Sequence, residues 1–475
     1  MEYNYVSPLN ERYSSNEMKK IFSSENKFTT WRKLWLTLAK GEKELGLNIS
    51  DEQIKELEEN LYNLNIDVAK EREKIVRHDV MSHVYAYGVQ CPKAKGIIHL
   101  GATSCYVGDN TDIIVMHEAL NLIRIKLVSV MKSLSKFCDE YKDLPTLGFT
   151  HFQAAQLTTV GKRASLWLHD LQLDYEEICS VINSLKLRGV KGTTGTQASF
   201  LELFKGDSNK VKKLDSYVAK AMGFNAVYPV TGQTYSRKID SRILNCLSSI
   251  AQSASKFSND MRLLQNLKEL EEPFNKNQIG SSAMAYKRNP MRSERITSLS
   301  RFVISNSLNP AFTAASQWLE RTLDDSANKR LAVTECFLTI DAILDIYLNI
   351  TTGIVVYPKI IEKHINEELP FMATENIIMM CVKKGMDRQE VHEIIRKHSM
   401  EAGKHVKIEG KDNNLIKLLC SDKELGLNEQ DLINTFEAKN YIGRSTEQVG
   451  EYLETLKPIF EEYSTLIKEN SVLNV

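Results

Sequence analysis

The sequence predicts an all-α protein built around a central bundle of long helices. Only 22 glycines and 10 prolines occur in 475 residues, so residues that interrupt helices are sparse. Long stretches carry apolar residues at steps of three and four, which is the period of a helix with one buried face. Strand patterns are few, and the best are 226–230 and 354–357. These three observations favour helix-on-helix packing over a sheet-based fold.

The stretch 111–141 predicts the first long helix. Its apolar residues recur at helical spacing: Ile113, Met116, Leu120, Ile123, Leu127, Val130, Leu134 and Phe137. A helix of about 30 residues is roughly 45 Å long at about 1.5 Å per residue. Asp109 or Asn110 is the expected N-cap, because a short polar side chain can accept a hydrogen bond from a free helical N–H.

Four later stretches have the same pattern: 155–188, 236–267, 291–318 and 326–350. Asn289 and Pro290 are the expected N-cap and first residue of the third of these, because a proline there lacks only a donor that would be unpaired anyway. The apolar steps drift from strict heptad spacing, which argues against a coiled coil. Shorter helical pieces flank the bundle. We therefore predict three helical domains, at residues 1–110, 111–357 and 358–475.

Composition excludes several classes of partner. Lys plus Arg equals Asp plus Glu at 61 each, so the zero net charge predicts no general attraction for nucleic acid or an anionic membrane. No apolar run approaches the roughly 18 residues that span a bilayer. The eight cysteines are scattered without a CxxC pair, which is typical of reduced thiols. With no signal peptide pattern at the start, we expect a cytoplasmic protein.

The loop Gly280–Pro290 is the strongest candidate for chemistry. Two serines follow Gly280, and Lys287 and Arg288 stand just before a predicted helix start. Helix starts, cations and hydroxyls together favour binding of an anion. A serine can also act as a base where cations and amide donors stabilise its alkoxide. The alternative is a simple connection with a capped helix.

Three other loops are polar and poorly explained by packing. The segment 146–153 carries His151, which can exchange protons near neutral pH, although a lone histidine is more often structural. The segment 101–110 has hydroxyls and amides that suit a carboxylate, unless it only caps a helix. In 77–83, His78 and His83 are five apart and lack the HExxH arrangement, so no metal site is expected.

Several arginines stand in or beside predicted loops, at Arg12, Arg295, Arg321 and Arg330. Ser326 and Arg330 are four residues apart at a predicted helix start, so they share one helix face. A hydroxyl and a guanidinium in that position suit a phosphate. Solvated surface charge is the alternative for any one of these arginines.

The residues of these loops resemble a known family. GSSAMAYKRNP resembles the signature GSSxMPxKxNP of the fumarase/aspartase superfamily. Longer strings resemble the adenylosuccinate lyases of the eukaryotic type within it: LGATSCYVGDNTD, RHDVMSHV, LPTLGFTHFQ, KGTTGTQASF, TGQTYSRK, RTLDDSANKR and ELPFMATENI. The likeness covers essentially the whole chain.

The resemblance implies a three-domain all-α protein whose central helices form a twenty-helix core in a homotetramer. It implies active sites shared between subunits and small-molecule nucleotide substrates. Fumarate is expected to leave adenylosuccinate, giving AMP, and the succinyl-carboxamide ribotide SAICAR, giving AICAR. No metal and no cofactor are expected.

Individual roles also follow from the resemblance. Ser281 is the expected general base, His151 the general acid, and His78 the third catalytic-site residue, supporting binding in the pocket. The positions that match substrate-binding residues of the family are Arg12, Tyr13, Arg77, Asp79, Thr103, Ser104, Thr150, Gln233, Lys287, Asn289, Arg295, Arg321, Ser326 and Arg330.

Two departures and two rival functions remain. Ala285 and Ala154 stand where the family usually has proline, and each adds roughly 0.4–1 kcal/mol of unfolded-state entropy. One rival is another fumarate-releasing lyase such as argininosuccinate lyase or fumarase, against which the 321–330 segment and Gln233 argue. The other is a catalytically silent helical assembly protein, against which the intact Ser281, His151 and His78 argue.

Overall fold

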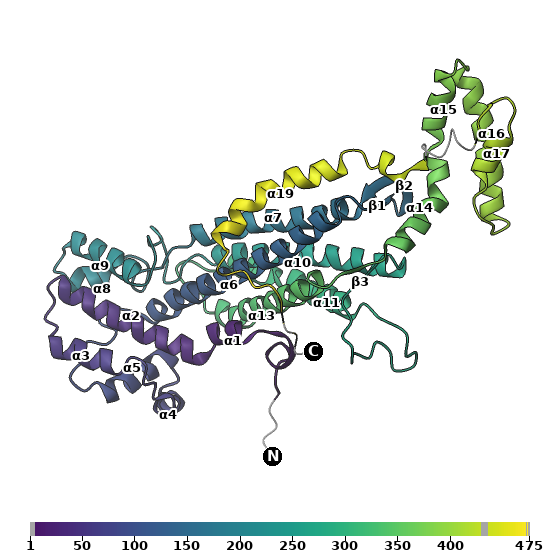
Figure 1. Cartoon of the computed structure of the whole chain (residues 1–475). Coiled ribbons are helices and arrows are strands. Elements are labelled where there is room, and N and C mark those ends of the chain that lie inside the picture. Colours follow the sequence, from purple (N-terminus) through teal and green to yellow (C-terminus); the bar gives the residue numbers. More distant parts are fainter. Residues whose placement is uncertain (1–4, 429–435, 472, 474–475) are drawn as a thin grey trace.

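The computed structural model of the chain describes residues 5–428, 436–471 and 473. Its long helices run side by side in a central bundle (Figure 1), formed by α6 (Ser104–Glu140), α7 (Val160–Ser184), α10 (Lys238–Asn266), α11 (Met291–Asn306) and α13 (Asp325–Thr351). Within the described residues the only strands form two small two-stranded sheets. The predicted all-α fold with a central bundle is confirmed.

The longest helix, α6, buries the whole apolar stripe that the sequence predicts. All eight of those side chains belong to the main hydrophobic core, and none is more than 6% exposed. Burial of each such side chain contributes roughly 1.5–3 kcal/mol to stability, so this stripe strongly stabilises the packing of α6 against its neighbours. The helix has 37 residues, which makes it about 55 Å long.

The predicted start of α6 is wrong. The helix begins at Ser104 with Thr103 as N-cap, so the predicted caps Asp109 and Asn110 lie inside it and are buried. Their side chains bond to distant segments instead of to the helix start. Asp109 pairs with Arg237, and the Asn110 amide lies 3.3 Å from the carbonyl of Gly189. Both polar side chains therefore bond to residues that are distant in the sequence, and local residue spacing does not reveal such partners.

A β-hairpin replaces the first part of the predicted helix 155–188. Strand β1 (Pro145–Thr150) pairs antiparallel with β2 (Gln153–Thr159), and Thr150 faces Gln153 across the turn. Helix α7 then begins at Val160, where the Thr159 side chain accepts the N–H of Lys162 at 3.0 Å. The hairpin is rich in threonine, a β-branched residue that favours strands, and it packs against α14 (Pro358–Met372).

The predicted helix 291–318 is two helices. Helix α11 ends at Asn306, Ser307 interrupts the run, and α12 spans Leu308–Ser316. Pro310 lacks the N–H that a continuous helix needs to reach the carbonyl of Asn306, which explains the break. The N-terminus of α11 also differs by one position, because Pro290 is its N-cap and Met291 its first residue.

Most of the smaller helices gather at the two ends of the bundle, whereas η1 (Leu9–Tyr13) and α1 (Asn16–Ile21) lie along its side and contact α13. One end carries α2 (Ser24–Glu44), α3 (Asp51–Glu59), α4 (Ile66–Val76), α5 (Asp79–Gln90), α8 (Ala198–Leu203) and α9 (Ser208–Ala221). Figure 1 places α2–α5, α8 and α9 at the end opposite the β1–β2 hairpin. Helix α2 packs along α6 and α9, so this end is continuous with the central core.

Beyond the hairpin, α15 (Thr374–Lys383), α16 (Arg388–Lys407) and α17 (Leu415–Ser421) form a projecting lobe with its own apolar core (Figure 1). After η3 (Ala438–Tyr441), α19 (Ser445–Glu462) returns along α6 and α7 and joins the main core. The division into domains at residues 110 and 357 stays a prediction.

The two strand candidates have different outcomes. Strand β4 (Val355–Val356) lies within the candidate 354–357 and pairs with β3 (Leu270–Glu271). The candidate 226–230 contributes only an isolated bridge between Val227 and Leu187. No helix in the described part of the chain is long and apolar enough to cross a membrane.

Candidate active site

His78 and Ser104 meet at the end of the bundle where α5 and α6 begin. His78 is the N-cap of α5, and its Nδ1 accepts the N–H of Met81 at 3.3 Å. Its Nε2 lies 3.2 Å from Oγ of Ser104, the first residue of α6. The preceding Arg77 is exposed and has a left-handed backbone with φ 54°, which turns the chain sharply between α4 and α5. The structure therefore brings two separate predicted loops to one place.

The start of α6 presents free donors beside this histidine. The Thr103 N-cap makes no side-chain capping bond, and within the described residues its Oγ1 has no hydrogen-bond partner. The first N–H groups of a helix also carry a partial positive charge. Cys105 follows, with Sγ 3.8 Å from Oε1 of Gln233. Hydroxyls, helix amides and a glutamine side chain in one place can bind a carboxylate.

The start of α13 completes this group with arginines. Arg330 is exposed, with Nη2 3.8 Å from a carboxylate oxygen of Asp79, and Ser326 lies one turn earlier in α13. Arg321 lies 2.9 Å from both carboxylate oxygens of Asp325. Ser326 and Arg330 both lie near the start of α13, four residues apart. The prediction that they share one face at a helix start is therefore confirmed.

A buried ion-pair network that sequence reasoning missed lies beneath these arginines. Arg237 reaches Asp325 at 2.6 Å and Asp109 at 3.0 Å, and all three side chains are buried. Burial is the largest influence and raises the pKa of Asp109, but Arg237, Lys329 and Arg188 together outweigh it, and the net shift is downward. Burial likewise lowers the pKa of Arg237, but Asp109, Tyr235 and Asp240 together outweigh it and leave that pKa above its ordinary value. The network links α6, α10 and α13. In the sequence, its only signal is the charged string YSRK, which contains Arg237.

Ser281 lies in an irregular loop between β3 and α11. Its Oγ accepts the N–H of Met284 at 3.1 Å and that of Ala283 at 3.3 Å. Two amide donors on one hydroxyl oxygen favour its alkoxide form, as a serine base requires. The Asn289 amide donates to the carbonyl of Gly280 at 2.7 Å and closes the base of the loop. A Cβ on Gly280 would stand 2.1 Å from the carbonyl of Lys287, so only glycine fits there.

The two cations of this loop are placed differently from the expectation. The guanidinium of Arg288 turns to Glu271 at 3.3 Å and lies over the ring of Phe274. Lys287 is exposed and directly precedes it. The backbone amides, rather than Arg288, are thus the groups that contact Ser281. Ala285 occupies the second position of a turn closed by Lys287 N–H and the carbonyl of Met284 at 3.0 Å, a position where proline is favoured.

His151 stands at the tip of the β1–β2 hairpin. His151 and Phe152 have positive φ values of 54° and 58°, as a tight two-residue hairpin turn requires. Thr150, His151 and Phe152 are exposed, so the imidazole projects from the end of the bundle. A hairpin tip presents a side chain to a partner surface more rigidly than the open loop that we expected from the sequence.

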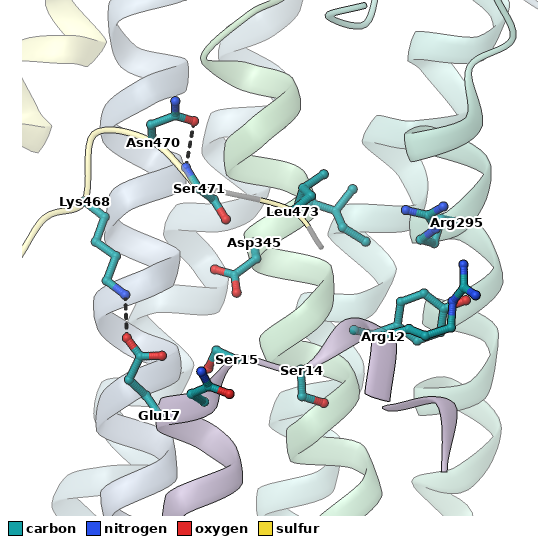
Figure 2. Close-up of a pocket in the computed structure, with 13 residues that line it drawn as sticks. Arg12, Ser14, Ser15, Glu17, Arg295, Asp345, Lys468, Asn470, Ser471 and Leu473 are labelled. Carbon is teal, nitrogen blue, oxygen red and sulfur yellow. Dashed lines mark hydrogen bonds and ion pairs between the residues drawn. The ribbon is translucent and has the colours of Figure 1, made fainter. Parts of the chain in front are cut away.

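Arg12, Tyr13 and Arg295 line a small cavity on the side of the bundle. Its volume is about 230 Å³, and its other walls come from residues 14–17, from α13, and from Lys468, Asn470, Ser471 and Leu473. The guanidinium of Arg295 lies 5.7 Å from the centre of the Tyr13 ring. In Figure 2, Arg12 and Arg295 lie at one end of this cavity and Lys468 lies at the other.

The predicted catalytic groups do not converge within one chain. Ser104 begins α6 and the hairpin with His151 follows its far end, so about 55 Å of helix separates them. Arg237 precedes α10 and the Ser281 loop follows it, and α10 has 29 residues, or about 44 Å. Figure 1 shows the hairpin and α5 at opposite ends of the bundle. The structure therefore groups His78, Asp79, Ser104 and Arg330, and leaves Ser281 and His151 apart from them.

Comparison with known proteins gives a consistent picture. A family model described as lyase matches residues 6–305, and one described as adenylosuccinate lyase C-terminus matches residues 370–452. The chain is 53% identical over 480 residues to an adenylosuccinate lyase of Saccharomyces cerevisiae, with 99% of each chain covered. It is 51% identical to the Schizosaccharomyces pombe enzyme of that name, with 98% of each covered. The chain is 44% identical to a Schistosoma mansoni enzyme of that name, with 99% of each covered.

Solved structures with the same fold are more distant in sequence. A 3-carboxy-cis,cis-muconate lactonizing enzyme from Pseudomonas putida matches with a TM-score of 0.81 at 18% identity, covering 95% of this chain and 99% of that one. A fumarate lyase from Mesorhizobium sp. BNC1 matches with a TM-score of 0.79 at 19% identity, covering 95% and 100%. At these identities the likeness concerns the fold.

Proposed function

This chain belongs to the adenylosuccinate lyase family, and from that premise we propose that it eliminates fumarate from adenylosuccinate, giving AMP. The same elimination acts on the succinyl-carboxamide ribotide SAICAR and gives AICAR. The observation that carries the proposal is the full-length similarity, since 99% of this chain aligns with a relative of that name. The His78–Ser104 contact and the two amide donors on Ser281 support it independently.

Ser281 and His151 divide the proton transfers. The Ser281 alkoxide removes the Cβ proton of the succinyl group, and the electron pair left on that carbon forms the double bond of fumarate. The C–N bond breaks, and His151 protonates the leaving nitrogen. A base and an acid on opposite faces of the substrate are what an anti elimination needs. The amides of Ala283 and Met284 supply the stabilisation that a serine base requires.

Residues that lie near His78, together with Lys287 of the Ser281 loop, hold the two ends of the substrate. As the proton leaves, negative charge grows on the neighbouring carboxylate, and Thr103, Ser104 and Lys287 are the donors assigned to it. Ser326 and Arg330 bind the remote phosphate, while Arg321 and Gln233 contact the nucleotide. Binding of the remote phosphate fixes the reacting carbon in place and so contributes to the rate as well as to affinity. Arg12, Tyr13 and Arg295, which line the cavity on the side of the bundle, also bind the substrate. Arg77, Asp79, Thr150 and Asn289 complete the proposed substrate-binding set.

A homotetramer with shared active sites would bring these groups together. One chain holds His78 and His151 at opposite ends of a helix about 55 Å long, so a neighbouring chain must supply the missing group. Antiparallel packing of long helices from different subunits places opposite ends side by side. The region from α12 to α13 is consistent with such packing, because it exposes large apolar side chains at Phe312, Trp318, Leu319, Leu323 and Leu331.

We also place the protein in the cytoplasm. None of the eight cysteines takes part in a disulfide in the described part of the chain, and Cys91, Cys138, Cys246, Cys336 and Cys381 are buried. Reduced, buried thiols are typical of a reducing compartment. Fluorescence microscopy of the tagged protein, with a cytosolic and an organellar marker, tests this assignment.

The decisive experiment is a substrate comparison with purified protein. We expect fumarate to appear, by chromatography, when adenylosuccinate or SAICAR is added, and not when argininosuccinate is added. The Ser281→Ala variant is the matched control for contaminating lyase activity. Fumarate release from argininosuccinate alone would favour the rival lyase. No release from any of the three substrates would favour a silent assembly protein.

A further inference from the structure

A lysine is buried in the middle of α6. The side chain of Lys126 is 4% exposed, and its Nζ lies 2.5 Å from Asp341 and 2.7 Å from Asp345. The two aspartates stand four residues apart on α13, so they share the helix face that meets α6. A charge is not kept in a protein interior unless it is paired, so this contact links α6 and α13 tightly.

The charges of this cluster do not cancel. Burial lowers the pKa of Lys126, but Asp341 and Asp345 outweigh it and hold its pKa above the ordinary value. Burial raises the pKa of Asp345, and Lys126 opposes that shift. One ammonium faces two carboxyl groups, so the cluster needs further hydrogen-bond donors.

Ser15 supplies those donors from a distant part of the chain. Its N–H lies 2.6 Å from Oδ2 of Asp341, and its Oγ lies 3.0 Å from Oδ1. The same Oγ accepts the N–H of Met18 at 3.2 Å and so caps α1. Asp341 is fully buried, and a bond from an N–H to a buried carboxylate is among the stronger hydrogen bonds in a protein.

The neighbouring Ser14 is fastened to the same helix. Its Oγ donates to the carbonyl of Leu9 at 2.8 Å and lies 3.2 Å from the carbonyl of Leu338 on α13. Both residues after η1 therefore rest on α13. This anchoring matters because η1 has only five residues, too few to hold a helical conformation alone.

Arg12 and Tyr13 are the last two residues of η1. They line the cavity of about 230 Å³ together with Arg295 and Asp345, one of the two partners of Lys126. In Figure 2, Ser14 and Ser15 lead directly from Arg12 past Asp345 to Glu17. The buried cluster thus stands immediately behind the part of the chain that carries Arg12 and Tyr13.

We propose that Lys126 and Asp341 are positioning residues that hold Arg12 and Tyr13 in their substrate-binding geometry, acting through Ser15. This inference rests on the proposed function, because that function gives Arg12 and Tyr13 their substrate. The cluster fixes the Ser14–Ser15 segment before substrate arrives, so less conformational entropy is lost on binding.

Ser15→Ala tests the link, with Ser23→Ala as its matched control. Ser23 caps α2 in the same way, with Oγ accepting the N–H of Asn26 at 3.1 Å, but its own side chain donates only to the nearby carbonyl of Lys20. Both variants lose one helix cap. We expect Ser15→Ala to raise KM for adenylosuccinate roughly tenfold with kcat changed less than about threefold, and Ser23→Ala to change neither.

A double-mutant cycle separates positioning from a general loss of structure. In the Arg12→Ala background, Ser15→Ala is expected to raise KM by less than about twofold, because the group that it positions is gone. Ser15→Pro offers a second probe of the N–H bond, since φ of −69° at Ser15 suits proline and Ser14 is extended. We expect Ser15→Pro to raise KM at least as much as Ser15→Ala.

Lys126→Met leaves two buried carboxyl groups without a cation, so we expect little of this variant to fold. The Ser15 variants therefore provide the test of the positioning role. An unchanged KM in both Ser15 variants, beside a raised KM in Arg12→Ala, would overturn the positioning role and leave the proposed function standing. Full additivity in the double-mutant cycle would also overturn it. Failure of the unaltered protein to release fumarate would instead remove the proposed function itself, and this inference with it.

Discussion

Oγ of Ser104 lies 3.2 Å from Nε2 of His78, across the junction of α5 and α6. Because Nδ1 of His78 accepts the N–H of Met81, a neutral imidazole carries its proton on Nε2 and donates it to Ser104. The hydroxyl proton of Ser104 then remains for another acceptor. A substrate carboxylate at the start of α6 is the acceptor that this geometry suits.

Loss of that hydroxyl should weaken substrate binding. We expect Ser104→Ala to raise KM for adenylosuccinate roughly tenfold, because one hydrogen bond to a charged group is removed. Ser104→Thr keeps the hydroxyl and is expected to stay closer to the unaltered enzyme. Initial rates over a range of substrate concentrations measure both. An unaltered KM in Ser104→Ala would assign the contact to packing alone.

Removal of the proposed base or acid should abolish most turnover without unfolding the protein. Ser281→Ala and His151→Ala are each expected to lower kcat by roughly 10²–10⁴. Both residues lie outside the buried core, so circular dichroism should show the helix content unchanged. A variant with near-normal kcat would exclude its residue from the proton transfers.

Mixing the two inactive proteins tests whether sites are shared. If one site draws Ser281 and His151 from different chains, mixed Ser281→Ala and His151→Ala oligomers contain some sites with both groups intact. Partial activity should return after subunit exchange. Exchange is verified by native mass spectrometry with differently tagged chains. No recovery in verified mixed oligomers would place both residues of each site on one chain.

The buried cation Arg237 should be essential for stability. Arg237→Met leaves Asp109 and Asp325 buried without their partner, and we expect a loss of roughly 3–5 kcal/mol in the free energy of unfolding. Arg242, an exposed residue of α10, provides the control, and Arg242→Met should change stability by less than about 0.5 kcal/mol. Urea unfolding followed by circular dichroism measures both variants. An equal change in the free energy of unfolding in the two variants would show that the buried network stabilises the fold no more than an exposed charge does.

Glu42 should make the protein less stable as the pH rises. It is fully buried, neither carboxyl oxygen has a partner among the described residues, and burial raises its pKa from 4.5 to about 9. The folded state then keeps a proton that the unfolded chain releases. The contribution of Glu42 to stability is therefore most favourable below about pH 4.5, and it falls by about 1.4 kcal/mol per pH unit until the pH reaches about 9.

Glu42→Gln removes this titration. The variant should be more stable than the unaltered protein at neutral pH, and the difference should widen between about pH 6 and about pH 8. Glu44→Gln, at an exposed position of the same helix, should show no such widening. Urea unfolding at the two pH values measures the difference. A constant difference would mean that Glu42 is ionised in the folded protein.

Local sequence was enough to predict the helices that have one strongly apolar face. The stripe on α6 and the bounds of α10 and α13 needed only the period of three and four residues. The β1–β2 hairpin was missed, because its short strands follow directly on one long helix and precede another. Its threonines and the turn at His151 are weak signals beside those helices.

By itself, the sequence determined the all-α fold class, the candidate loops and the family, since apolar period and local motifs are properties of neighbouring residues. Only the tertiary structure decided where those loops lie. Asp109 was predicted as a helix cap, but it is the buried partner of Arg237, more than a hundred positions away along the chain. His78 and Ser104 meet, whereas His151 and Ser281 stand at the far ends of α6 and α10, because long helices fix the distance between their ends.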